Sequence, residues 1–193
     1  MSGYIWGYRV ERPLRADARR NRERLIEVAQ AAFTEHGVDA PMDDIARRAQ
    51  VGPGTLYRHF PTREALLLAV YRSDVERVAE RARVLGEELP PLEALDAWLH
   101  EQLLYISHRG GMGAAIKKML SSDTETLDYC RDAMRAAAGG LLERAQQAGL
   151  VRADADATTL LRLVHAVGLA SETAPEQAEP MLSIVIAGLR SSA

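Results

Sequence analysis

Residues 51–66 read VGPGTLYRHFPTREAL, and the interpretation of the fold starts from this stretch. A Gly-Pro-Gly sequence at 52–54 precedes a short TLYRHF segment, and Pro61 interrupts the chain after it. Proline is tolerated at the start of a helix, because its missing N–H would be unpaired there anyway. The pattern therefore predicts a tight turn, a short helix over residues 53–60 and a new helix after Pro61.

Glycines near a helix start also occur in phosphate-binding loops, where a strand precedes them and Gly-Lys-Ser/Thr ends the loop. Here a helical segment precedes them, since Ile45, Ala46 and Ala49 share one face of residues 42–50. No lysine follows the glycines. The spacing instead favours a helix-turn-helix, in which the second helix enters the major groove and the first lies across the DNA backbone.

The rest of the 193-residue chain also repeats its apolar residues with a helical period, and no segment alternates as a strand does. Leu25, Ala29 and Phe33, for example, recur every four residues before a stop at Gly37. We expect an all-α fold of about nine helices. They are expected over residues 17–36, 42–50, 53–60, 61–85, 92–107, 112–120, 124–148, 157–170 and 175–190.

Composition restricts the class of protein. Hydrophobic residues make up 47% of the chain, yet no apolar run approaches the ~20 residues that span a membrane. The N-terminus shows no signal-peptide pattern. A single cysteine, Cys130, excludes an intrachain disulfide and fits a reducing compartment. We expect a cytoplasmic protein without a membrane partner.

The charge is unevenly distributed. Residues 1–60 carry ten Arg and eight acidic residues, whereas residues 61–193 carry fourteen Lys and Arg and nineteen acidic residues. Seven of the arginines lie between Arg9 and Arg24. A basic N-terminal part on an acidic protein indicates that one end meets a polyanion, although solvated helix faces produce similar patterns.

Three motifs together resemble the DNA-binding domain of TetR/AcrR-family transcriptional regulators: the run from Leu25 to Phe33, DDIARRA, and VGPGTLYRHFPTREALLLAVY. The resemblance covers residues 17–71, and the C-terminal half more weakly resembles an SbtR-like subgroup of the family. It implies a homodimeric repressor, released from a palindromic double-stranded operator when its helical domain binds a small, mainly apolar effector. It divides the chain into an arm (1–16), a helix-turn-helix domain (17–61) and a ligand-binding and dimerisation domain (62–193).

The resemblance also implies roles in DNA binding. Thr55 matches a position that reaches bases or phosphates, Tyr57 and His59 match phosphate contacts, and Arg63 matches a basic position that opens the fourth helix. Packing is the alternative for the two aromatic side chains. Arg58 either reads a guanine edge or neutralises phosphate. The expected DNA-binding residues are Arg15, Arg19, Arg47, Arg48, Gly54, Thr55, Tyr57, Arg58, His59 and Arg63.

Two positions depart from the family pattern. Many relatives have a hydroxyl residue where this chain has Ala40-Pro41, and Ser-Lys where it has Gly52-Pro53. One helix cap and one phosphate-binding lysine are therefore missing. Binding is expected to depend more on Arg47 or Arg48 and on the basic arm, which either follows the minor groove or phosphates or remains a solvated tail.

The C-terminal part shows no metal-ligand spacing, nucleophile elbow or cofactor motif, so we assign no catalytic residue, metal or cofactor. The rival interpretation is an enzyme or carrier on an all-α scaffold. Methionines and aromatic residues on neighbouring helices favour an adaptable apolar pocket, with core packing as the alternative for each residue. The expected pocket residues are Trp98, Gln102, Leu103, Tyr105, Ile106, Met112, Ile116, Met119, Cys130, Met134 and His165.

The last two helices, containing TLLRLVHAVGLA and MLSIVIAGL, are apolar nearly all round and therefore require burial on more than one side. We expect the same pair of helices from a second subunit to cover them in a two-fold symmetric four-helix interface. The expected interface residues are Leu160, Leu163, Val164, Val167, Gly168, Met181, Ile184, Val185 and Gly188.

Overall fold

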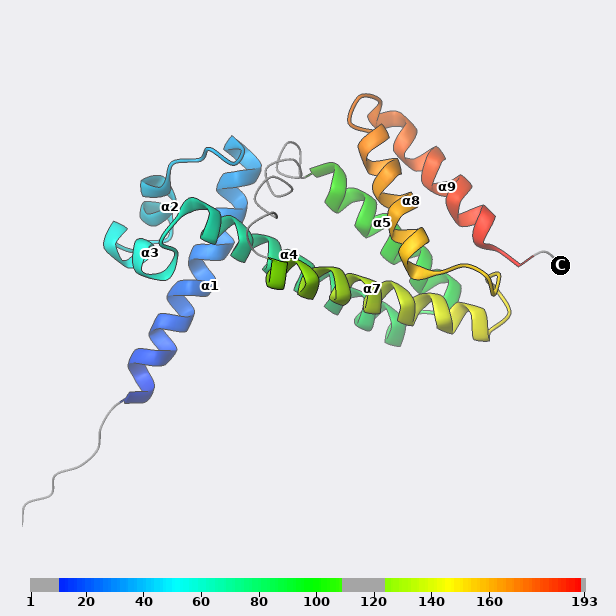
Figure 1. Ribbon diagram of the computed structural model, residues 1–193, viewed down its shortest axis with the longest axis horizontal. Helices are drawn as coiled ribbons and strands as arrows, with labels where there is room; N and C mark the ends of the chain where they lie inside the picture. The colour runs from blue at the N-terminus through cyan, green and yellow to red at the C-terminus, as the bar shows by residue number, and fades with distance from the viewer. Residues whose placement is uncertain (1–10, 109–123, 192–193) are drawn as a thin grey trace, which may run out of the picture. The chain divides into compact units, whose positions relative to one another are not determined.

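The computed structural model describes residues 11–108 and 124–191, and these residues form an all-α protein, as the sequence predicted (Figure 1). The chain divides between Leu66 and Leu67 into two compact units. The elements are α1 (Glu11–His36), α2 (Met42–Arg48), α3 (Pro53–His59), α4 (Arg63–Glu88), α5 (Pro91–His108), α7 (Thr124–Gln147), α8 (Ala157–Ala170), a 3-10 turn η1 (Pro175–Gln177) and α9 (Ala178–Leu189).

In the N-terminal unit, α1, α2 and α3 pack around one small core. Leu25, Phe33 and Ile45 are buried at its centre, and Leu56 anchors α3 to it. Each of these side chains lies on the apolar stripe of its helix, so burying the stripes against one another fixes how the three helices pack. The turn between α2 and α3 is thereby held on a rigid support.

The turn itself is a Schellman motif, a helix end closed by a residue of left-handed conformation. The Val51 N–H donates to the Ala46 carbonyl at 3.0 Å, and the Gln50 N–H donates to the Arg47 carbonyl at 3.0 Å. Gln50 takes the left-handed conformation, with φ of 57°. Glycine normally occupies this position, as Gly149 does after α7 with φ of 70°, so the sequence did not indicate the strained residue.

In the C-terminal unit, α5 packs against α7, α8 and α9. Trp98 of α5 is fully buried, and its indole N–H donates to the Val78 carbonyl of α4 at 3.0 Å. Leu160 of α8 and Leu182 of α9 complete the same core. Asp156 caps α8 by accepting hydrogen bonds from the first amides of that helix, which confirms the expected helix start.

Most helix boundaries lie within three residues of the sequence prediction, and two differ in a larger way. Helix α1 begins at Glu11 rather than near Asp17, so the last part of the expected arm is helical; Pro13 is compatible with this, because it lies in the first turn. The last expected helix is divided into η1 and α9. The expected helix at 112–120 lies outside the described residues.

None of the described helices is both long and apolar enough to span a bilayer. Over the same residues, no three His, Cys, Asp or Glu side chains gather in a way that would hold a metal ion.

Candidate nucleic-acid interface

Helix α3 presents one exposed face. Gly54, Tyr57 and Arg58 lie at i, i+3 and i+4 and are all exposed, with Tyr57 at 46%. Leu56 and Phe60 are buried, so they anchor the helix from behind. Burial of one side of α3 therefore forces the phenol and a guanidinium outward.

The backbone at the start of α3 is open. A Cβ atom added at Gly52 or Gly54 would meet nothing within 4 Å, so a bulky ligand can approach the main chain there. Thr55, one residue further, is half-buried. Close backbone approach and an exposed phenol are both features that suit a DNA groove.

The structure gives Arg63 a different role from the one expected. Its guanidinium donates hydrogen bonds to the carbonyls of Val38, at 2.9 Å, and of Ala40. The side chain is half-buried and holds the connection between α1 and α2. A guanidinium committed to two carbonyls has fewer N–H groups left for a phosphate, so we correct Arg63 to a structural residue.

His59 also differs from the expectation. Its Nε2 atom is buried, and it has no hydrogen-bond partner in the described part of the chain. Burial lowers the pKa of the imidazole, and the nearby positive charges of Arg58 and Arg22 lower it further. His59 is therefore a neutral, half-buried side chain next to the interface, and Nε2 is not exposed to a phosphate.

Ion pairs engage several of the expected cations. Arg48 bonds to Glu35 at 2.7 Å and to Asp44 at 2.8 Å, and these partners raise the pKa of its guanidinium. Arg47 also pairs with Asp44. Arg19 lies 3.6 Å from the carboxylate of Glu23. Arg15 lies in the first turns of α1.

Besides Arg63, which binds carbonyls, three arginines whose side chains are described in this unit have no carboxylate partner there: Arg22, Arg24 and Arg58. Of these three, only Arg58 was expected to bind DNA. Arg22 places its Cζ atom 5.4 Å from the centre of the Phe60 ring. The sequence does contain one indication of the position of Arg22. It precedes Ile26 and Ala29 by four and seven residues and so continues the core-facing stripe of α1.

The expected effector residues are mostly packed. Trp98 and Cys130 are fully buried in the C-terminal unit, Tyr105, Ile106 and Met134 pack at the edge of its core, and His165 is exposed. Gln102 is only 3% exposed, and its Nε2 atom has no partner within the described segments. Met112, Ile116 and Met119 lie outside the described residues.

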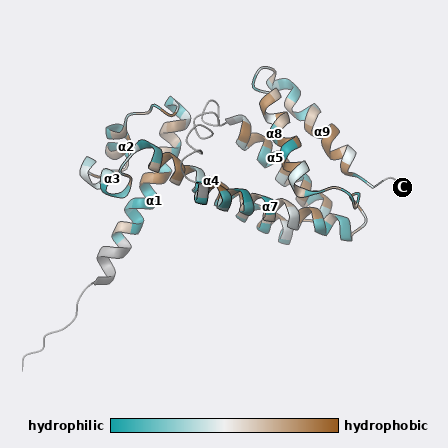
Figure 2. Ribbon diagram, in the orientation of Figure 1, coloured by the Kyte–Doolittle hydropathy of each residue, from teal (hydrophilic) through white to brown (hydrophobic). Residues whose placement is uncertain are grey.

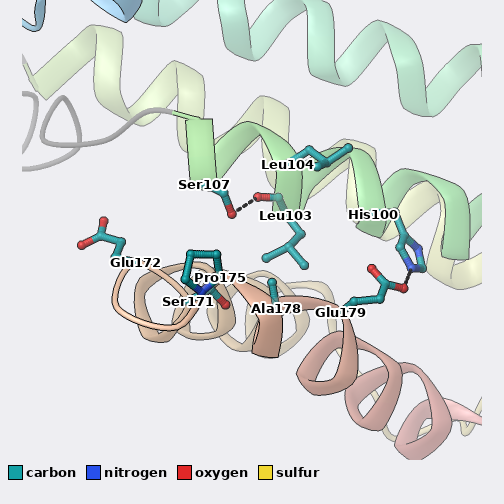
Figure 3. A pocket seen from close by; sticks show the side chains of 9 residues that line it. All are labelled: His100, Leu103, Leu104, Ser107, Ser171, Glu172, Pro175, Ala178 and Glu179. Carbon is teal, nitrogen blue, oxygen red and sulfur yellow. Dashed lines mark hydrogen bonds and ion pairs between the residues drawn. The ribbon is translucent and has the colours of Figure 1, made fainter.

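A pocket with a volume of about 460 Å³ lies between α5 and the connection from α8 to α9 (Figure 3). Of the expected effector residues it includes Leu103 alone. His100 and Glu179, joined at 2.7 Å, lie at one end, and Ser171 and Glu172 at the other. Partial burial opposes a raised pKa of His100, but the Asp96 carbonyl and Glu179 outweigh it, so that pKa lies above its ordinary value.

The expected interface residues fall into two groups. Leu160, Val164, Val167 and Gly168 are buried within the subunit, and a Cβ atom at Gly168 would lie 2.4 Å from the Ile106 Cγ2 atom. We therefore no longer assign Gly168 to a subunit interface, because its lack of a side chain accommodates α5 of the same subunit. Leu163 and Ile184 are exposed at 45% and 73%, Gly188 is exposed with open space above it, and Met181 and Val185 are half-buried.

A short, well-supported helix that projects polar groups after a tight turn defines the helix-turn-helix class of DNA-binding proteins. Two family descriptions match the chain: the bacterial regulatory proteins of the tetR family over residues 25–70, and the C-terminal domain of SbtR-like transcriptional regulators over residues 90–191. The second match confirms the weaker resemblance of the C-terminal half.

Solved structures agree. The TetR transcriptional regulator SCO0520 from Streptomyces coelicolor is 37% identical, with a TM-score of 0.76, over 89% of this chain and 99% of its own. A TetR regulator from Mycobacterium vanbaalenii is also 37% identical, with a TM-score of 0.73, over 93% and 100%.

A curated relative, the transcriptional regulator UidR of Escherichia coli, is 29% identical over 110 residues, 56% of this chain and 54% of its own. The chain thus spans about half the length of the curated relatives it matches. It belongs to the TetR family of bacterial regulatory proteins.

Proposed function

We propose that this protein is a homodimeric repressor that binds a palindromic operator and is released from it by a small, mainly apolar effector. The observation that carries the proposal is the exposed face of α3, where Tyr57 and Arg58 project beside the open backbone of Gly54. Relatives that share more than a third of its residues are described as transcriptional regulators, which supports a regulatory role over the enzyme or carrier alternative.

The exposed side of α8 and α9 supports a dimer. Leu163, Leu169 and Ile184 expose 45%, 51% and 73% of their surface, and Figure 2 shows both helices as mainly hydrophobic. Exposed apolar side chains clustered on one helix pair are typical of a subunit interface. A two-fold symmetric dimer that reads a palindromic site requires its two α3 helices to lie about 34–36 Å apart, one turn of DNA.

The buried amide of Gln102 supports an effector site in the C-terminal unit. A buried donor without a partner is costly, and a ligand oxygen that accepts its N–H would remove that cost. The surrounding side chains, including Trp98 and Leu103, are apolar. These contacts favour a mainly apolar effector that carries a hydrogen-bond acceptor.

Fluorescence anisotropy with fragments of the DNA upstream of its own gene tests the proposal. We expect tight, salt-sensitive binding to a fragment with an inverted repeat, at a stoichiometry of two subunits per site. Tyr57→Ala should weaken binding at least about 10-fold by removing a charge-assisted hydrogen bond to phosphate.

Two controls decide what such a result means. Tyr57→Ala should leave the thermal midpoint unchanged, because the side chain is exposed, whereas Leu56→Ala should lower stability by about 2–5 kcal/mol. Unfolding of Tyr57→Ala would show that the phenol packs rather than binds. Absence of salt-sensitive binding to any inverted repeat would overturn the proposal.

A further inference from the structure

Arg22 combines exposure, a free charge and a fixed position at the edge of the helix-turn-helix core. Its guanidinium is exposed and has no carboxylate partner among the described residues. The Cζ atom lies 5.4 Å from the centre of the Phe60 ring, within the range of a cation–π contact. Phe60 is itself 2% exposed and directly follows α3, so Arg22 is attached to the end of the recognition helix.

Arg58 directly precedes His59 in the chain, is exposed and has no ion-pair partner in the described structure. The charges of both guanidiniums are felt at the His59 ring, whose pKa they lower. Two like charges held near one half-buried ring repel each other, and an anion between or beside them would relieve the repulsion. This concentration of unpaired positive charge has no counterpart at Arg47 and Arg48, which are neutralised by carboxylates.

We propose that Arg22, held over Phe60, binds a phosphate of the DNA backbone and acts together with Arg58 at the end of α3. This inference rests on the proposed function and identifies which cations carry it. It would also add a phosphate contact to a domain that lacks the lysine many relatives carry where this chain has Pro53, but at the opposite end of α3, next to Phe60. The planar guanidinium can lie flat on the ring and still direct N–H groups outward, which an ammonium cannot do equally well.

Arg24 is the matched control for this proposal. It is on the same helix, is also exposed and has no ion-pair partner among the described residues, but it lies two residues away and therefore on a different face of α1. A contribution from general positive charge would affect Arg22 and Arg24 alike. A specific phosphate contact would affect Arg22 alone.

The experiment measures the affinity of wild type, Arg22→Gln, Arg24→Gln and Arg48→Gln for an inverted-repeat fragment and a scrambled fragment at salt concentrations from 50 to 300 mM. For Arg22→Gln we expect the slope of log affinity against log salt to fall by about 0.9, the loss of one phosphate contact. The loss should be similar on both fragments, since phosphate carries no sequence information. Arg24→Gln and Arg48→Gln should keep the wild-type slope.

Arg22→Met separates binding from packing. It keeps an unbranched cover over Phe60 and removes the charge, so it should lose the same slope as Arg22→Gln with the wild-type thermal midpoint. An unchanged slope in both Arg22 variants, or an equal loss in Arg24→Gln, would overturn the inference while wild-type binding still supports the proposed function. Failure of the wild type itself to bind in a salt-sensitive manner would overturn both.

Discussion

The exposed face of α3 and the exposed side of α8 and α9 have opposite chemistry. On α3 the outward groups are a phenol and a guanidinium beside a bare backbone, at Tyr57, Arg58 and Gly54. On α8 and α9 they are aliphatic, with Leu169 and Ile184 among them. The first surface fits a hydrated polyanion, and the second fits a dry apolar partner.

The two surfaces also differ in how a helix separates its outward residues from its core. On α3 the outward residues carry polar groups or no side chain and the core residues are apolar, so exposure follows residue type. On α8 both sets are apolar: Leu163 is 45% exposed, whereas Val164, the next residue, is 1% exposed. Only the direction of each side chain distinguishes exposed residues from core residues there.

The largest effect is expected when a charge replaces a buried apolar side chain of α8 rather than an exposed one of α9. Val164→Arg would bury an unpaired charge and should cost about 4 kcal/mol or more of stability, enough to unfold many domains. Ile184→Arg, at a 73% exposed position, should keep the fold and yield monomers. Urea unfolding and light scattering check both outcomes, and a folded, dimeric Ile184→Arg would place the interface elsewhere.

A pair of glycines sharpens the same distinction. Gly168→Ala would place a Cβ atom 2.4 Å from the Ile106 Cγ2 atom, and such overpacking should cost about 1–3 kcal/mol. Gly188→Ala adds a methyl group in open space and should stabilise the subunit by up to about 1 kcal/mol through helix propensity. The thermal midpoints of the two variants, measured at the same low protein concentration, compare these effects. Equal effects would contradict the assignment of one glycine to the core and the other to the surface.

The two Schellman turns provide a smaller comparison between the units. Gln50 holds φ of 57° where Gly149 holds 70°, and only glycine accepts this conformation without a steric cost. Gln50→Gly should therefore stabilise the N-terminal unit by up to about 1 kcal/mol, measured as a shift of the urea midpoint. Gly149→Gln should have the opposite sign. Destabilisation by Gln50→Gly would mean that the side chain makes a stabilising contact of its own.

The smallest expected effect is a pH dependence in the C-terminal unit. His100 pairs with Glu179 at 2.7 Å, and its folded-state pKa lies above the ordinary value. The pair therefore stabilises the fold fully below pH ~6.5, and this contribution disappears as the pH rises through the folded pKa. Glu179→Gln should lower the thermal midpoint at pH 5.5 and leave it nearly unchanged at pH 8.5. An equal decrease at both values would exclude the charge as the cause.

Much of the N-terminal unit was predictable from the sequence. Tyr57 was expected on the outer face of α3 and is exposed, whereas Leu56 and Phe60 are buried. The reason is local: in a short helix between two turns, the anchors and the outward groups differ in polarity, and the helical period assigns each to a side. The motifs that carry the family resemblance of residues 17–71 are local sequence patterns of the same kind.

The tertiary structure decided which cations are free. Arg58, Arg63 and Arg48 look equivalent in the sequence, yet one is unpaired in the described structure, one binds two carbonyls and one binds two carboxylates. Their partners come from residues up to 25 positions away, so no local pattern could reveal them. Arg22 was missed for the same reason, since its contact with Phe60 depends on how α1 meets α3.

The sequence by itself therefore determined the class of fold, the core of the helix-turn-helix unit and the outward face of α3, because these follow from helical period and residue polarity. Only the tertiary structure decided which apolar residues of α8 face their own subunit and which arginines keep an uncommitted charge. Direction and pairing are set by contacts between distant segments, and such contacts exist only after the chain has packed.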